Sequence, residues 1–216
     1  MTPFPQSQPD KPIRARAHPD ELRARILEVA EAHFRRIGHH KTSIADIAAG
    51  LGMSPASIYR FFPSRDAINE SICGRVVNES ADIAFAIART SASASEKLSR
   101  ILTAVHVHNK ITLVKDRHIH DLIVAALQEN WPVIKAHIER MVTIFEQIIR
   151  QGVESGEFEV DDAAEAAQAV KSAFLPFFHP MVIEHCVQLG EDSEAELRNQ
   201  IRFILKALCA SAPSRA

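Results

Sequence analysis

Residues 42–62 have the sequence TSIADIAAGLGMSPASIYRFF, and this stretch decides the fold. Ile47 and Leu51 recur at helical spacing and are expected to face the core from a short helix. Ala48 is small enough for a second helix to cross closely, and Gly52 stands at the turn, where a left-handed backbone is easiest for glycine. The Ser-Pro pair that follows is typical of a helix start. The stretch therefore predicts a helix-turn-helix.

The second helix of this motif presents small, polar and basic side chains on the side that does not pack. Such side chains let a helix approach the major groove and contact phosphates and base edges. Candidate DNA-binding residues on or beside this helix are Ser54, Pro55, Ala56, Ser57, Tyr59 and Arg60. Flanking candidates are Lys41, Thr42, Ser43 and Arg65. One of Thr42 and Ser43 is expected to be a helix cap, Phe61 is expected to be buried, and burial is the alternative for Tyr59.

A surplus of positive charge also distinguishes the first part of the chain. Residues 1–65 hold ten lysines and arginines against six aspartates and glutamates, whereas the remaining residues hold 15 against 21. A basic segment suits a polyanion such as DNA, although chance clustering of solvated charges explains the counts equally well. Residues 1–17 carry four prolines and few core-forming residues, so we predict a disordered arm there.

Composition and motif content exclude several classes of protein. The 216-residue chain is 46% apolar, which suffices for a core without disulfides, and its three cysteines show no zinc-ligand spacing. The sequence shows no signal peptide and no apolar run of membrane-spanning length, so we expect a cytoplasmic protein with no membrane partner. Because it also has no G-x-S-x-G elbow, glycine-rich phosphate loop or HExxH motif, we expect neither an enzyme nor a cofactor.

Beyond residue 65 the apolar residues recur at helical spacing, without strand-like alternation of useful length. Together with a first helix that begins near Pro19 and ends at Gly38, this periodicity predicts an all-α chain of about nine helices. The six later helices are expected at about 64–89, 95–115, 116–130, 132–152, 161–187 and 193–209. We expect residues 18–65 to form an N-terminal three-helix DNA-binding domain and residues 66–211 a larger helical domain for ligand binding and dimerisation.

Residues 22–72 resemble the DNA-binding domain of the tetracycline-repressor (TetR/AcrR) family of transcriptional regulators. The resemblance rests on the amphipathic first helix that ends at Gly38, and on TSIADIAAGLGMSPASIYRFFPSRDAI, where Tyr59 and Phe62 stand at the family's aromatic pair. Residues 148–158, IIRQGVESGEF, are similar to the junction before the family's last two helices. Two recognition helices related by a twofold axis contact successive major grooves, so we expect a homodimer on a palindromic operator in double-stranded DNA.

The last two predicted helices each carry an apolar stripe. The family resemblance implies that the stripes form half of a four-helix bundle between two subunits, and packing within one subunit is the alternative. The predicted dimerisation residues are Val170, Phe174, Phe177, Phe178, Met181, Leu197, Ile201, Ile204, Leu205 and Leu208.

The remaining helices enclose either a solid core or a pocket, and periodicity does not distinguish the two. His120 shares a helical stripe with Trp131, an unusual place for an ionisable ring, so we favour a pocket for an organic molecule. The residues expected at its edge are His120, Trp131, Phe145 and Phe174. Metal sensing by the histidines of this domain is the alternative. However, His118 and His120 are two residues apart and point to nearly opposite sides of a helix, as do His106 and His108.

These features predict a one-component transcriptional regulator, a repressor whose affinity for its operator is modulated by a small-molecule effector of unknown identity. We expect the effector to relieve repression by changing the separation of the two recognition helices. A helical interaction protein, in which the helix-turn-helix only packs, is the competing class.

Overall fold

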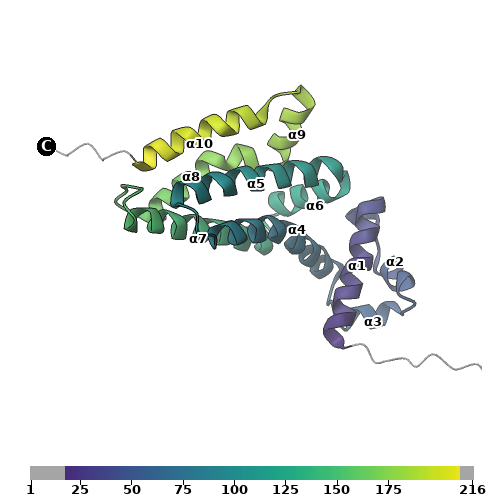
Figure 1. Ribbon diagram of the computed structural model, residues 1–216. Coiled ribbons are helices and arrows are strands. Elements are labelled where there is room, and N and C mark those ends of the chain that lie inside the picture. The colour runs from purple at the N-terminus through teal and green to yellow at the C-terminus, as the bar shows by residue number, and fades with distance from the viewer. Residues whose placement is uncertain (1–17, 210–216) are drawn as a thin grey trace, which may run out of the picture.

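Within residues 18–209, the range that this computed structural model describes, the chain consists of helices and connecting turns and contains no strand (Figure 1). The helices are α1 (Pro19–Ile37), the 3₁₀ helix η1 (His39–Lys41), α2 (Ile44–Gly50), α3 (Pro55–Tyr59), α4 (Arg65–Ala88), α5 (Ala94–Lys115), α6 (Arg117–Gln128), α7 (Pro132–Glu154), α8 (Ala163–Phe178), α9 (Pro180–Leu189) and α10 (Ser193–Cys209). The predicted all-α class is therefore confirmed. The disordered arm predicted for residues 1–17 lies outside the described residues, as do residues 210 and 211.

The described residues form ten α-helices rather than about nine, because the stretch 161–187 is broken at Pro180. The residue between the two pieces, His179, has extended backbone angles, with φ of −75° and ψ of 123°. A residue before proline disfavours the helical conformation, and proline fits the first turn of a new helix. The prediction of one continuous helix was wrong for this reason.

The predicted helix-turn-helix is formed by α2 and α3. Ser43 caps α2: its hydroxyl accepts a hydrogen bond from the backbone N–H of Asp46 (3.1 Å), and its own backbone N–H donates to the Asp46 carboxylate (2.9 Å). Gly52 has a φ of +63° in the turn, a conformation that glycine adopts without steric strain. Ser54 then caps α3, which begins with Pro55. Caps and turn are those that the sequence indicated.

Two hydrophobic clusters hold the helices together. The first joins α1, α2 and α3 to the start of α4 and to α6, and its fully buried residues include Phe34, Ile47, Ile58, Phe62 and Ile72. The second joins the rest of α4 to α5, α7, α8 and α10. As Figure 1 shows, α1–α3 therefore lie at one end of the molecule, and the long helices run beside one another in the remainder.

Ion pairs on the surface also connect α1 to α4 and to the start of α6. The Arg35 guanidinium donates to a carboxylate oxygen of Asp116 (2.5 Å) and to one of Glu31 (2.8 Å). Glu31 in turn lies 3.6 Å from the guanidinium of Arg75 on α4. Asp116 also caps α6, because its second carboxylate oxygen accepts a hydrogen bond from the Ile119 backbone N–H (3.1 Å).

A buried histidine at the end of α1 makes the stability of the fold depend on pH. His39 is 3% exposed, and its ring lies 6.2 Å from that of Phe34 and 3.7 Å from that of His40. Burial, with the nearby charges of His40 and Arg65, lowers the pKa of His39 from 6.5 to about 4. Between these pH values the unfolded chain binds a proton that the folded chain does not. The free energy of unfolding therefore decreases as the pH is lowered from about 6.5 to about 4.

We predict that urea denaturation will show this loss of stability as the pH falls from about 7 to about 4. His39→Phe removes the titrating group but keeps a buried ring, so its unfolding free energy should depend less on pH than that of the native protein. His185→Gln, at an exposed position on α9, is the control and should keep the native pH dependence. An unchanged pH dependence in His39→Phe would contradict the assignment.

The end of α7 tolerates no side chain at Gly152. A Cβ atom placed there would lie 2.2 Å from the Phe158 ring, which is itself buried. We predict that Gly152→Ala lowers the free energy of unfolding by about 1–3 kcal/mol, as overpacking typically does. The same substitution in a Phe158→Leu background should be less destabilising, because the smaller side chain leaves room. Urea denaturation of the four proteins measures both effects, and additive changes would contradict the proposed clash.

Candidate DNA-binding surface and internal cavity

One side of the short helix α3 is apolar and packs against the rest of the protein, and the other side is exposed. Ile58 and Phe62 are fully buried against the first hydrophobic cluster, whereas Tyr59 is 52% exposed. The Ser54 hydroxyl accepts a hydrogen bond from the Ser57 backbone N–H at 3.3 Å, so the start of the helix is fixed by its own cap. The arrangement leaves an exposed face with the size and polarity of a major-groove recognition helix.

Arg23 on α1 positions the other end of α3, a role that sequence reasoning missed. Its guanidinium donates to the Phe61 backbone carbonyl (2.6 Å) and lies over the Phe62 ring, 4.1 Å from the centroid. The two contacts fix the end of α3 against α1. The sequence held no local signal for them, because the partners are 38 residues apart.

Most of the predicted DNA-binding residues have accessible side chains. The exposed ones are Lys41, Ser43, Ser54, Pro55, Ala56, Tyr59 and Arg60, while Ser57 and Arg65 are half-buried. Thr42 is the exception: it is 1% exposed, and its hydroxyl donates to the Gly38 carbonyl at 3.0 Å. The prediction that Thr42 contacts DNA is therefore corrected. Thr42 instead closes the turn between α1 and α2, and Ser43 is the residue that caps α2.

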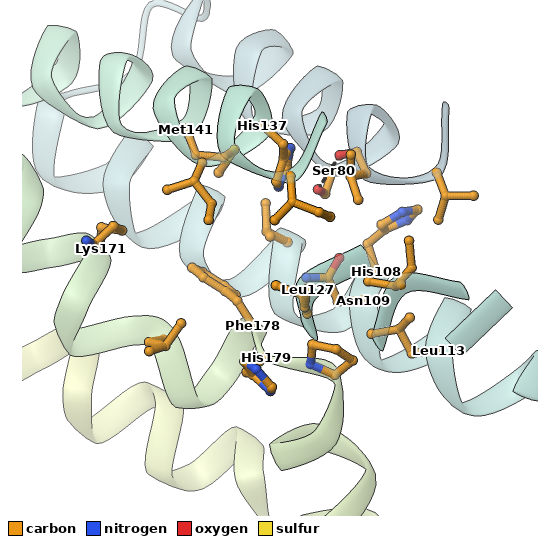
Figure 2. A pocket seen from close by; sticks show the side chains of 18 of the residues that line it. Ser80, His108, Asn109, Leu113, Leu127, His137, Met141, Lys171, Phe178 and His179 are labelled. Carbon is orange, nitrogen blue, oxygen red and sulfur yellow. Dashed lines mark hydrogen bonds between the residues drawn. The ribbon is translucent and has the colours of Figure 1, made fainter. Parts of the chain in front are cut away.

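A cavity of about 300 Å³ lies between α4, α5, α6, α7 and the α8–α9 junction, where the two hydrophobic clusters meet (Figure 2). Its apolar lining comes from both clusters and includes Val76, Leu113, Ile134, Val105, Met141 and Phe145. Its polar lining consists of Ser80, His108, Asn109, Thr112, His137, Lys171, Ser172 and His179. In the close-up, His137 and His179 approach the cavity from opposite walls.

Only one of the four residues predicted at the edge of a pocket lines this cavity. Phe145 does so, but Phe174 is fully buried within the second cluster and Trp131 packs against the first, where its ring N–H donates to Glu129 (2.8 Å). The rings of Phe174 and Trp131 pack in or against the hydrophobic clusters and do not line the cavity. The prediction is corrected for these two residues. Most of the lining was missed, because periodicity does not show where packed helices leave a gap.

His120 lies in a separate, smaller hollow of about 180 Å³ between α5, α6 and α9. Its ring is 4% exposed, and its Nε2 atom lies 3.3 Å from a carboxylate oxygen of Glu184. Arg117 also binds Glu184, so that carboxylate connects α6 to α9. The prediction that His120 shares a pocket with Phe145 is thus wrong, since the two line different cavities.

The unusual ionisation of His137 follows from its place in the cavity wall. Burial, with the positive charge of Arg140, lowers the pKa of His137 to about 4, so the ring is neutral at neutral pH. Its Nδ1 atom and that of His179 are buried and have no hydrogen-bond partner among the described residues. The cavity therefore offers unused hydrogen-bonding atoms within an apolar lining.

The predicted dimerisation stripe is mostly occupied within the subunit. Five of its ten residues are buried in the second cluster, namely Val170, Phe174, Leu197, Ile201 and Leu208. Phe177, Phe178, Ile204 and Leu205 are half-buried, and Met181 is 50% exposed. The same helices expose Leu175 and Phe203, which are 55% and 67% exposed and were not predicted. Half of the predicted residues thus pack within the subunit, and a role of the stripe in dimerisation stays a prediction.

Metal binding finds no support in residues 18–209, which contain no group of three or more histidine, cysteine, aspartate or glutamate side chains placed to hold an ion. The same range has no helix with the length and apolar character needed to cross a lipid bilayer.

Two family descriptions match the chain. "Bacterial regulatory proteins, tetR family" matches residues 26–72, and "Tetracyclin repressor-like, C-terminal domain" matches residues 94–198. Among characterised proteins, the HTH-type transcriptional regulator LuxR of Vibrio harveyi is 25% identical over 203 residues, which is 91% of this chain and 93% of LuxR. The HTH-type transcriptional repressor KstR2 of Mycobacterium tuberculosis is 26% identical over 148 residues, 64% of this chain and 70% of KstR2.

Solved structures share the fold at lower sequence identity. A TetR-family regulator from Pectobacterium atrosepticum superposes with a TM-score of 0.65 at 19% identity, covering 93% of this chain and all of that one. SmeT, the repressor of the Stenotrophomonas maltophilia multidrug efflux pump SmeDEF, superposes with a TM-score of 0.61 at 19% identity. The superposition covers 86% of this chain and 89% of the SmeT chain. The two matched regions include both the DNA-binding helices and the larger helical domain that follows them in the chain. Together they account for more than two-thirds of the chain. This protein therefore belongs to the TetR family of DNA-binding transcriptional regulators.

Proposed function

We propose that the protein is a homodimeric repressor that binds a palindromic operator through α3 and releases it when a small organic molecule enters the cavity. The observation that carries this proposal is the exposed face of α3, set against the burial of Ile58 on its other face. KstR2 and SmeT, two of the similar proteins, are repressors, and SmeT is also known as a complex with triclosan.

The cavity is placed to influence the recognition helix. Val76 on α4 lines the cavity and belongs to the same hydrophobic cluster as Ile58 of α3. Ile123 on α6 also lines it, and α6 is joined to α1 by the Arg35–Asp116 ion pair. A ligand that separates α4 from α6 would shift the helices that carry α3, and in a dimer this changes the distance between the two recognition helices.

The sharpest test of the proposed function is selection of bound sequences from a random DNA pool with the full-length protein. We expect a palindrome whose half-sites are about one helical turn apart, as twofold-related recognition helices require. Failure to enrich any sequence at low ionic strength would overturn the proposal, because non-specific electrostatic attraction is strongest there.

Tyr59 and Arg60 provide a direct test of the DNA-binding face. Tyr59→Ala should weaken binding to the selected operator roughly tenfold, as expected for loss of one hydrogen bond to a phosphate. Arg60→Ala should reduce the slope of log affinity against log salt by about 1 if the guanidinium neutralises one phosphate. Fluorescence anisotropy measures the affinity of each variant for the operator and its dependence on salt concentration.

The control for these two variants is Phe85→Ala, at an exposed aromatic position on α4 outside the helix-turn-helix, and it should bind DNA as the native protein does. Circular dichroism establishes that each variant is folded. If folded Tyr59→Ala and Arg60→Ala both keep the native affinity and salt slope, α3 is not the recognition helix.

The exposed side of α8 and α10 provides the test of dimerisation. Phe203 is 67% exposed on α10 and Leu175 is 55% exposed on the neighbouring α8, and aromatic residues are enriched where a second subunit covers the surface. We predict that Phe203→Asp raises the dimer dissociation constant at least tenfold in sedimentation equilibrium, because a charge would be buried without a partner. Phe203→Leu keeps an apolar side chain and should stay dimeric. A Phe203→Asp protein that dimerises normally would place the interface elsewhere.

A further inference from the structure

The size and lining of the cavity define the body of the molecule that it can hold. Its walls are mainly apolar, with Val76, Val105, Leu127, Ile134 and Met141 among them. A volume of about 300 Å³ lies at the lower end of the range of roughly 300–1,000 Å³ found for ligand pockets. The cavity is therefore large enough for a small organic molecule with an apolar body.

The charges in the wall have one sign. Lys171 is the one lysine or arginine among the residues that line the cavity, and none of these residues is an aspartate or glutamate. No ion pair to Lys171 forms within residues 18–209. The Glu79 carboxylate lies 3.6 Å from the ring of the lining residue His108, but its side chain is 55% exposed and does not itself line the cavity. A cationic ligand would thus meet the like charge of Lys171, whereas an anionic ligand would meet an opposite charge that has no ion-pair partner among the described residues.

Two histidines of the wall offer hydrogen-bonding atoms to a ligand. Buried polar atoms without partners are rare in folded proteins, and the Nδ1 atoms of His137 and His179 are two such atoms. Because burial keeps the pKa of His137 at about 4, this ring is neutral at pH 7 and can donate to a ligand oxygen. Figure 2 shows Lys171 at one end of the cavity and His108 and Leu113 at the other, so the charged group is at an end.

From these features we infer that the effector is an elongated monocarboxylate amphiphile, whose carboxylate pairs with Lys171 and whose apolar body extends toward Leu113. The inference rests on the proposed function, since it names the ligand class of the same cavity. Nothing covalent takes place: binding exchanges water around the carboxylate and the ammonium for an ion pair at the edge of an apolar cavity.

Three probes of similar length separate the charge of the ligand from its shape. Decanoate, decan-1-ol and decyltrimethylammonium share a ten-carbon chain and carry a negative, a neutral and a positive head. Isothermal titration calorimetry with the full-length protein at pH 7.5 should give decanoate the highest affinity by at least roughly tenfold. Equal or tighter binding of decyltrimethylammonium, or absence of binding by all three, would overturn the inference.

Variants of Lys171 then locate the carboxylate. Lys171→Met keeps the length of the side chain without its charge and should weaken decanoate binding roughly 10- to 100-fold while leaving decan-1-ol unaffected. Lys171→Arg should restore decanoate binding. Lys135→Met is the matched control, because Lys135 is 81% exposed on α7 and does not line the cavity. An equal loss of decanoate and decan-1-ol binding in Lys171→Met would show a packing role only and would contradict the ion pair.

A second readout distinguishes failure of this inference from failure of the proposed function. Affinity for the selected operator is measured with and without each probe. If decanoate binds in a Lys171-dependent manner without changing operator affinity, the ligand class stands and ligand-controlled release is wrong. If decan-1-ol or decyltrimethylammonium releases the operator and decanoate does not, ligand-controlled release stands and the carboxylate assignment is wrong.

Discussion

Helix α4 has to pack in two hydrophobic clusters at once, and the rest of the structure depends on this constraint. Ile72 and Val76 lie in the cluster that holds the helix-turn-helix, and Ala81 and Ala84 lie in the cluster of the long helices. Because α4 is continuous over 24 residues, one helix takes part in both clusters, and a displacement of α4 would act on both. The space left where the two clusters meet is the cavity, so the same helix borders the cavity and supports the recognition helix.

The helix-turn-helix could be predicted from the sequence because its signals are local. Ser43 and Ser54 cap helices within three residues of themselves, and Gly52 needs only its own φ angle. The sequence does not distinguish Thr42 from Ser43, since both can cap a helix and only the fold shows which one does. Pro180 carries a local signal, the restriction that proline imposes on the preceding residue, but apolar residues continue on both sides of it and obscure the break.

The cavity and the outward side of α8 and α10 could not be predicted in the same way. A cavity is space that five helices leave between them, and it depends on crossing angles and on side chains far apart in sequence. Phe174 and Phe145 have the same chemistry, yet one fills the core and the other lines the cavity. Helix α10 has one apolar stripe, and a single ring outside it, Phe203, leaves the helical pattern unchanged, so periodicity alone did not single out Phe203.

The carboxylate of Asp116 has two partners, one oxygen capping α6 and the other binding Arg35 of α1. A rotation of α6 that breaks the contact with α1 would leave a guanidinium and a carboxylate to be rehydrated. A rotation that keeps the contact has to carry α1 with it, and with α1 the Arg23 side chain that holds the end of α3. The Asp116 carboxylate therefore ties the first turn of α6 to the helix that supports the end of α3.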